Sequence, residues 1–206
     1  MKKILPAILC LVFAVSASAE KKDWGYVTGS LESNSNVYVE DAVNDFYPSM
    51  QPQLKDGNIF ASNNYLKVDW YKDRLSAGMQ MEGYFPSLVG YPVAQNNMTL
   101  SNIYVTWKDK SYSVTAGTFY DQFGSGLLFR SWEDRALGFN NALTGARFTY
   151  NYNDIVSVKA LWGMPRFGMK FSATQVKGAD ISFALSNLTG WDKVYLALEG
   201  SVMDRY

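Results

Sequence analysis

Residues 65–85, YLKVDWYKDRLSAGMQMEGYF, contain two runs of alternating apolar and polar side chains, separated by Lys72-Asp73. Period-two alternation is typical of a β-strand with two unlike faces, and a short polar break is typical of a tight hairpin. The apolar members of the two runs are Leu66, Val68, Trp70, Leu75, Ala77, Met79 and Met81. We therefore predict an antiparallel hairpin with one apolar face and one polar face.

The same alternation occurs along most of the chain and predicts an all-β fold, an antiparallel up-and-down meander of about nine strands. The expected strands are residues 24–32, 64–71, 74–84, 99–108, 111–120, 142–151, 155–163, 178–187 and 192–202. Their connections alternate between short breaks, such as Tyr152-Asn153-Asp154 and Thr189-Gly190-Trp191, and long ones at 33–63, 85–98, 121–141 and 164–177. This alternation is typical of transmembrane barrels, which have tight periplasmic turns and long external loops.

A closed sheet in a membrane shows lipid its apolar face and keeps its polar face toward a wet interior, because lipid cannot satisfy backbone groups. The candidate lumen-facing residues are Lys67, Asp69, Gln80, Glu82, Arg147, Lys159, Asp180 and Glu199. Both signs of charge occur in this set, which predicts an interior held by ion pairs rather than a strongly ion-selective pore. A soluble antiparallel sheet with one buried face gives the same alternation, but the connection lengths favour the barrel.

Residues 1–19, MKKILPAILCLVFAVSASA, have two lysines, a short apolar segment and a small-residue end. This pattern predicts a secretory signal peptide that is cleaved after Ala19, leaving residues 20–206 as the β-barrel domain. Cys10 is the only cysteine, so the mature chain has neither disulfides nor thiolate chemistry. No later apolar run reaches the length of a helical span. We therefore expect the protein in the outer membrane.

The charged residues give little reason to expect catalysis. The chain has 19 Lys and Arg, 19 Asp and Glu, and no histidine. Balanced charge without a basic tract argues against nucleic acid as a partner. Without histidine, Ser-His hydrolytic sites and histidine-bearing metal sites are excluded. We expect no enzymatic activity and no cofactor; the expected partners are outer-membrane lipid, and other envelope proteins or small solutes.

The segment DQFGSGLLFRSWEDRALGFNNALTG, residues 121–145, contains a candidate loop ion-pair cluster. Its members are Arg130, Glu133, Asp134 and Arg135. The segment either folds into the lumen as a constriction or plug, or forms a long external loop that these ion pairs hold together. We favour the structural role, since ordered loops often need such pairs.

The text GTFYDQFGSGLLFRSWEDRALGFNNALTGAR, with SNNYLKVDW before it and WGMPRF and VKGAD after it, resembles an uncharacterised family of Bacteroidota outer-membrane β-barrel proteins. The resemblance covers nearly all of the mature chain and implies location and architecture, but no activity, ligand or catalytic residue. Members of that family are considerably longer, which implies that this chain is the N-terminal portion of one. Single-chain bacterial barrels have even strand numbers. Nine strands therefore predict an incomplete, truncated barrel, seen as an open or poorly closed sheet.

Two functions follow from these patterns. The first is a non-enzymatic outer-membrane β-barrel protein that acts either as a channel or porin-like pore or as a structural component of an envelope complex. The alternative is a soluble or surface-exposed β-sheet module that binds glycans through its 6 tryptophans and 14 tyrosines.

Overall fold

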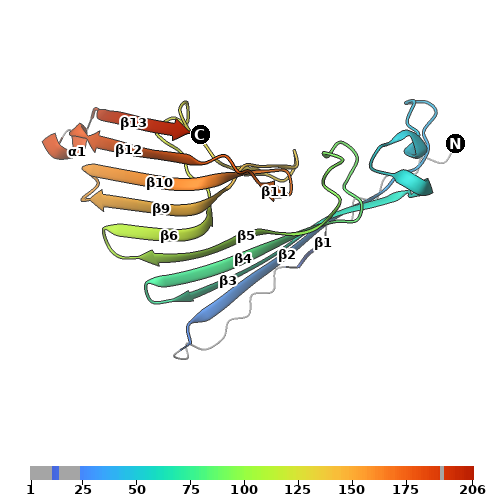
Figure 1. Cartoon of the computed structure of the whole chain (residues 1–206), viewed down its shortest axis with the longest axis horizontal. Coiled ribbons are helices and arrows are strands. Elements are labelled where there is room, and N and C mark those ends of the chain that lie inside the picture. The colour runs from blue at the N-terminus through green and yellow to red at the C-terminus, as the bar shows by residue number, and fades with distance from the viewer. Residues whose placement is uncertain (1–10, 14–23, 191–192) are drawn as a thin grey trace. The chain divides into compact units, whose positions relative to one another are not determined.

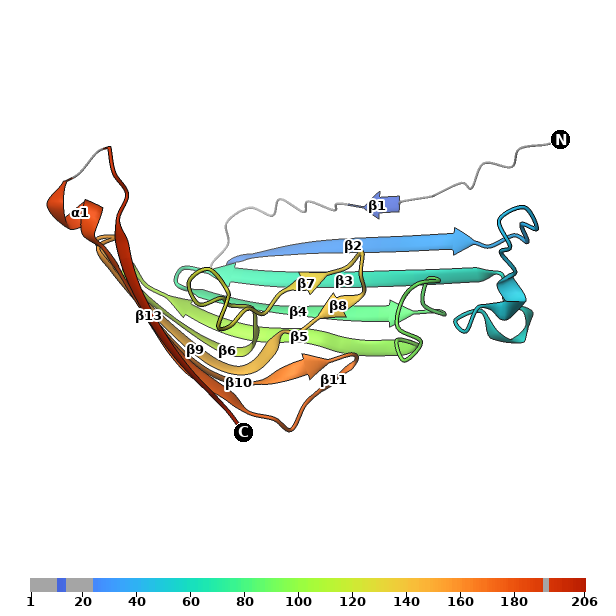
Figure 2. The same cartoon turned by 90° about the horizontal axis from the view of Figure 1, so that it is seen from above.

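The computed structural model describes residues 11–13, 24–190 and 193–206, and the fold is all-β. One antiparallel sheet contains the strands in the order β1-β2-β3-β4-β5-β6-β9-β10-β12-β13, as Figures 1 and 2 show. The strands of this order are β1 (Leu11–Phe13), β2 (Tyr26–Val37), β3 (Phe60–Lys72), β4 (Leu75–Tyr84), β5 (Asn97–Lys108), β6 (Tyr112–Phe119), β9 (Leu143–Tyr152), β10 (Val156–Phe167), β12 (Val176–Ala184) and β13 (Ala197–Arg205). Within the described residues no pairing joins the two ends of this order, so the sheet is open.

The remaining elements are short. They are β7 (Glu133–Asp134), β8 (Phe139–Asn140), β11 (Lys170–Phe171), the 3-10 turns η1 (Pro48–Met50) and η2 (Lys55–Gly57), and the helix α1 (Leu185–Thr189). β7 pairs with β8, and β11 pairs with β10. No helix in the described part of the chain has the length and apolar character needed to cross a membrane.

The chain forms two compact units. Of the described residues, the first unit contains 11–13, 24–70, 78–101 and 136–138, and the second contains 71–77, 102–135, 139–190 and 193–206. Of the predicted signal peptide, residues 1–10 and 14–19 lie outside the described residues. Leu11–Phe13 form β1, which pairs antiparallel with β2.

All nine predicted strands are present, with different bounds. The hairpin between β9 and β10 turns where the sequence predicts it, at Asn153 and Asp154, whose φ angles are 50° and 56°. Two consecutive positive φ values give a type I′ turn, which matches the twist of the flanking strands and which Asn and Asp tolerate well. The amide of Ile155 closes this turn by donating to the carbonyl oxygen of Tyr152 at 2.9 Å.

The prediction was wrong for the last connection. It expected a short break at Thr189-Gly190-Trp191, whereas β12 ends at Ala184 and β13 begins at Ala197. The intervening helix α1 ends at Thr189 and is capped by Gly190, whose φ is 69°. Local side-chain bonds explain the difference, because the Thr189 hydroxyl donates to the Leu185 carbonyl at 2.8 Å and the Ser186 hydroxyl donates to the Leu196 carbonyl at 3.1 Å.

In the second unit, β6, β9, β10, β12 and β13 pair in one continuous register. One row across these strands contains Thr115, Arg147, Leu161, Gly178 and Met203. The next row along the strands, Val114, Phe148, Ala160, Ala179 and Val202, points to the opposite face because successive side chains alternate. We call the face of Arg147 the polar face and the face of Phe148 the apolar face.

A row of three glycines also crosses the polar face of this unit. Gly117, Gly145 and Gly163 are direct partners on the adjacent strands β6, β9 and β10. A Cβ atom at Gly145 would contact the carbonyl oxygen of Trp162, and one at Gly117 would contact that of Ile103. The backbones therefore approach one another too closely along this row for a side chain to be added.

The main apolar cluster of the second unit lies on its polar face, not on its apolar face. Its buried members are Phe119, Phe123, Phe129, Leu143, Leu161 and Val176, with Met203 packed against them. Phe123 and Phe129 come from the connection that follows β6, so this connection supplies the rings that cover the strands.

Candidate functional site

The candidate site is the polar face of the second unit together with the connection that crosses it, residues 121–131, which we call the covering loop. Register places Ser113, Thr149, Lys159, Asp180 and Ser201 in one row across five strands of this face. Arg147 lies in the neighbouring row, two residues from Thr149 along β9. Two cations of the sheet therefore lie on the same side, next to each other.

Asp121, the first residue of the covering loop, bridges these two cations. Its Oδ1 atom lies 3.1 Å from Nζ of Lys159, and its Oδ2 atom lies 3.4 Å from Nη1 of Arg147. The Asp121 side chain is only 6% exposed, whereas those of Arg147 and Lys159 are 24% and 30% exposed. We call these three residues the Asp121 hub. Charge-assisted bonds of this kind are the stronger class of hydrogen bond, and burial of the carboxylate reduces their screening by water.

Both cations also bind backbone carbonyl groups, one directly before the covering loop and one within it. Nη1 of Arg147 donates to the carbonyl oxygen of Tyr120 at 3.0 Å, and Nζ of Lys159 donates to that of Gln122 at 2.8 Å. The hub therefore fixes three consecutive residues to β9 and β10, and not only one side chain.

The covering loop closes on itself through Asp121 and Ser131. The Asp121 amide donates to the Ser131 hydroxyl at 2.8 Å, and the Ser131 amide donates to the Asp121 carbonyl at 2.8 Å. Inside this closure, the Phe123 amide donates to the Phe129 carbonyl at 3.0 Å. These bonds satisfy backbone groups that a buried irregular segment would otherwise leave unpaired.

Two glycines allow the loop to approach β12 and β13. A Cβ at Gly178 of β12 would lie 2.7 Å from the Phe123 ring, so this ring rests on bare backbone. A Cβ at Gly124 of the loop would lie 2.5 Å from the Glu199 carboxylate of β13. The rings of Phe123 and Phe129 are 5.2 Å apart at an angle of 58°, an arrangement that aromatic pairs favour. The loop is thus held to the polar face by charge and by apolar packing together.

The structure brings three predicted lumen-facing residues to this site: Arg147 and Lys159 in the hub, and Glu199 beside Gly124. A fourth, Asp180, lies on the same face and accepts a hydrogen bond from the Ser201 hydroxyl at 2.6 Å.

The other four predicted lumen-facing residues belong to the first unit. There Lys67 pairs with Asp69 at 3.2 Å. Gln80 donates to Glu82 at 3.5 Å, and the Tyr84 hydroxyl donates to Glu82 at 3.0 Å. Asp69, Gln80 and Glu82 are all buried, so this unit also has a covered polar face.

The candidate loop ion-pair cluster is only partly a set of ion pairs. Arg135 lies 3.5 Å from Glu133, but Arg130 lies over the Trp132 ring, 5.1 Å from its centroid. Glu133 and Asp134 form β7, where they are the partners of Asn140 and Phe139.

Asp121, the centre of the site, is not among the site residues that the sequence predicts. One signal could have found it, because an acidic residue directly follows the predicted strand 111–120, and the next two predicted strands along the chain carry the inward cations Arg147 and Lys159. To predict which side chains on different strands meet, however, one must know the register between the strands. The alternation within a single strand does not give this register.

The contacts of this arrangement are ion pairs and hydrogen bonds that hold the covering loop to β9 and β10. Among residues 11–13, 24–190 and 193–206, no group of three or more acidic, histidine or cysteine side chains lies close enough together to hold a metal ion. The hub holds a loop in place and presents partly exposed cations beside it.

Comparison with known proteins gives a family and no described activity. No curated protein matches the chain. The model of a family of unknown function, DUF6029, matches residues 1–206 in full. The chain therefore belongs to the family of unknown function DUF6029.

Proposed function

We propose that the protein is a non-enzymatic β-barrel protein of a bacterial outer membrane, whose wall includes the strands described above. The observation that carries this proposal is that the sheet exposes large apolar side chains and buries charged and polar ones, the reverse of a soluble protein. Large apolar side chains of the strands are exposed, for example Ile103 at 56% and Val202 at 66%, whereas Glu82 on β4 is 2% exposed. Other exposed apolar strand residues are Leu66, Met79, Val105, Trp107, Val114, Phe148, Trp162, Ile181, Phe183 and Leu198.

The energetics of the apolar face favour lipid over water as its surroundings. Each square ångström of apolar surface left in water costs about 25 cal/mol relative to burial. Soluble monomers rarely expose contiguous apolar patches larger than a few hundred Å². In hydrocarbon the same face is stable, and the polar face is then shielded from lipid by the sheet itself. The proposal also requires that both edges of the open sheet be paired in the membrane, because lipid cannot satisfy their backbone groups.

In this proposal the covering loop lies inside the barrel wall and narrows the interior. The Asp121 hub supports this placement, because it fixes the loop to the face that points away from lipid. We infer that the protein is either a narrow, porin-like channel for small solutes or a structural component of an envelope complex. Its family resemblance supports Bacteroidota as the source.

Membrane fractionation of the full chain tests the location. We expect the protein in the outer-membrane fraction, resistant to extraction by carbonate and solubilised by detergent. Extraction by carbonate without detergent would contradict the proposal and favour a soluble or surface-exposed binding module. A helical membrane control protein, processed in parallel, shows that the carbonate treatment leaves integral proteins in place.

Conductance in planar bilayers separates the two versions of the function. A channel gives discrete steps that increase when the covering loop is released by Asp121→Asn. A structural component gives no conductance steps with the unmodified protein or with Asp121→Asn, although both proteins insert into the bilayer. Asp204→Asn is the matched control, because Asp204 pairs with Lys177 at 3.1 Å on the apolar face, opposite to the face that carries the covering loop.

A further inference from the structure

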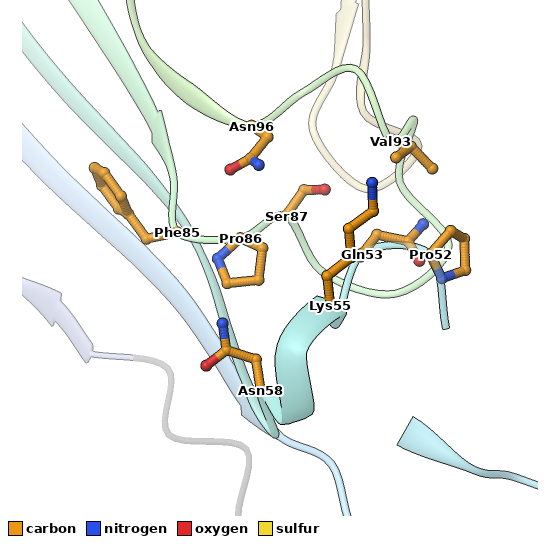
Figure 3. Close-up of a pocket in the computed structure, with 9 residues that line it drawn as sticks. All are labelled: Pro52, Gln53, Lys55, Asn58, Phe85, Pro86, Ser87, Val93 and Asn96. Carbon is orange, nitrogen blue, oxygen red and sulfur yellow. The ribbon is translucent and has the colours of Figure 1, made fainter. Parts of the chain in front are cut away.

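A pocket of about 390 Å³ lies within the first unit, between two connections (Figure 3). One connection, residues 38–59, joins β2 to β3, and the other, residues 85–96, joins β4 to β5. The lining residues are Pro52, Gln53, Lys55, Asn58, Phe85, Pro86, Ser87, Val93 and Asn96. This volume is at the lower end of the range of about 300–1,000 Å³ that is typical of small-molecule sites.

Hydrogen bonds within and around the two connections fix the walls of this pocket. Nε2 of Gln53 donates to the Tyr91 carbonyl at 2.7 Å, which joins the two connections. The Leu88 amide donates to Oδ1 of Asn63 at 3.0 Å, and the Val89 amide donates to the Tyr38 hydroxyl at 2.9 Å. The pocket is therefore formed before any ligand enters, and a ligand does not have to order the loops.

The side chains that line the pocket are mostly polar, and three of them are available for binding. Within the described residues, no hydrogen bond or ion pair engages the side chains of Lys55, Asn58 or Asn96. Each carboxamide can donate and accept, and the Lys55 ammonium supplies three donors and one positive charge. No acidic residue lines the pocket. Figure 3 shows the ammonium of Lys55 extending toward Ser87 and Val93.

The apolar part of the lining consists mainly of small aliphatic side chains and does not offer an aromatic ring for stacking. Phe85 is one of the lining residues, but Figure 3 shows its ring turned away from the other lining side chains. Pro52, Pro86 and Val93 supply the remaining apolar contacts. A flat aromatic ligand therefore finds no stacking partner, whereas a saturated ring with C–H faces can rest on these residues.

We propose that this pocket binds a small acidic sugar, a saturated ring with several hydroxyl groups and one carboxylate. Hydroxyl groups both donate and accept, which matches the carboxamides of Asn58 and Asn96. The single carboxylate matches the single cation, Lys55, through a charge-assisted hydrogen bond. A neutral sugar leaves that cation unpaired, and a polyanion such as nucleic acid needs several cations.

This proposal does not depend on membrane insertion, because every wall of the pocket belongs to the connections and not to the apolar face. If the barrel proposal holds, these long connections lie outside the cell, where the pocket meets sugars of the surroundings or of the cell surface.

Calorimetric titration of the detergent-solubilised full chain with galacturonic acid and with galactose tests the inference. We expect galacturonic acid to bind at least tenfold more tightly than galactose. Lys55→Gln removes the charge without shortening the side chain greatly, and it should remove this preference while leaving galactose binding unchanged. Asn96→Ala should weaken the binding of both sugars. Lys72→Gln, at an exposed position outside the pocket, is the matched control and should bind as the unmodified protein does.

Several results would overturn the inference. They are binding of neither sugar, equal affinity for both sugars, or unchanged galacturonic acid binding in both Lys55→Gln and Asn96→Ala. An equal loss of binding in Lys72→Gln would also overturn it, because the effect would then be one of overall charge. All of these outcomes are independent of carbonate extraction and conductance, so a failure here is distinct from a failure of the membrane proposal.

Discussion

The carboxylate of Asp121 lies 3.1 Å from the ammonium of Lys159, although 38 positions separate the two residues in the chain. This contact, with the Arg147 contact beside it, joins the covering loop to β9 and β10. A loop held in this way is fixed to the face of the sheet that it covers, and its stability depends on a few identifiable side chains.

Replacement of Asp121 by Asn should destabilise the covering loop. The substitution keeps the shape of the side chain but leaves two partly buried cations without their anion, at a cost of about 1–3 kcal/mol. Urea unfolding of the purified protein measures the loss, and limited proteolysis should show faster cleavage near Leu127, which is 95% exposed. Asp204→Asn removes an exposed ion pair and should change neither measurement. Equal effects of the two substitutions would contradict the role given to Asp121.

Replacement of Gly178 by Ala should displace the Phe123 ring. The added methyl group would lie 2.7 Å from that ring and 2.8 Å from the Val202 carbonyl oxygen. Overpacking of this kind costs about 1–3 kcal/mol. Thermal unfolding measures the cost, and the fluorescence or NMR signals of the loop report the displacement.

Gly200→Ala on β13 is the matched control for this experiment. The nearest atom to its added methyl group is the Ile181 side chain, at 4.0 Å. We expect a change within about 0.5 kcal/mol, which is usual for surface substitutions. A larger loss in Gly200→Ala than in Gly178→Ala would show that strand propensity, and not the contact with Phe123, determines the result.

Replacement of Phe148 by Lys tests the apolar face directly. If this face lies in lipid, a lysine near its middle costs about 2–4 kcal/mol. Folding yield into lipid vesicles, measured by protection from protease, should fall accordingly. Val43→Lys is the control, since Val43 is 93% exposed in the connection between β2 and β3. Normal insertion of Phe148→Lys would show that this face does not meet hydrocarbon.

Replacement of Asn153 by Val should weaken the hairpin between β9 and β10. A β-branched residue resists a φ of 50°, and the left-handed conformation costs roughly 1–2 kcal/mol. We expect the variant to refold from urea more slowly and to unfold at a lower urea concentration. The refolding rate and the urea midpoint are the two quantities to measure. Asn153→Gly should leave both unchanged or raise the midpoint, because glycine accepts this conformation without strain. A loss in Asn153→Gly as large as that in Asn153→Val would point to the Asn side chain instead.

The strands were predictable from the sequence because their signal is local. Alternation between neighbours defines a strand, and Asn153-Asp154 defines its turn without reference to the rest of the chain. The prediction of the last connection is wrong because Gly190 is not a turn residue between two strands. It follows a short helix that side-chain bonds of Ser186 and Thr189 stabilise.

The candidate site was less predictable, for a physical reason. Placing Lys159 and Arg147 on the polar face requires only alternation, but placing Asp121 between them requires the register of two strand pairs and the path of an irregular loop. The pocket beside Lys55 has the same origin. Its walls come from two connections in which no periodic pattern exists, and long-range hydrogen bonds such as Gln53 to Tyr91 hold them together.

The row of Gly117, Gly145 and Gly163 has a mechanical consequence for the second unit. Three neighbouring strands lack side chains at directly paired positions. The sheet therefore has a line of bare backbone that runs across the strands rather than along one of them. Bending is easiest along such a line. A bulky residue at any one of the three positions would push the neighbouring strands apart. The curvature of the sheet would then change over all three strands together.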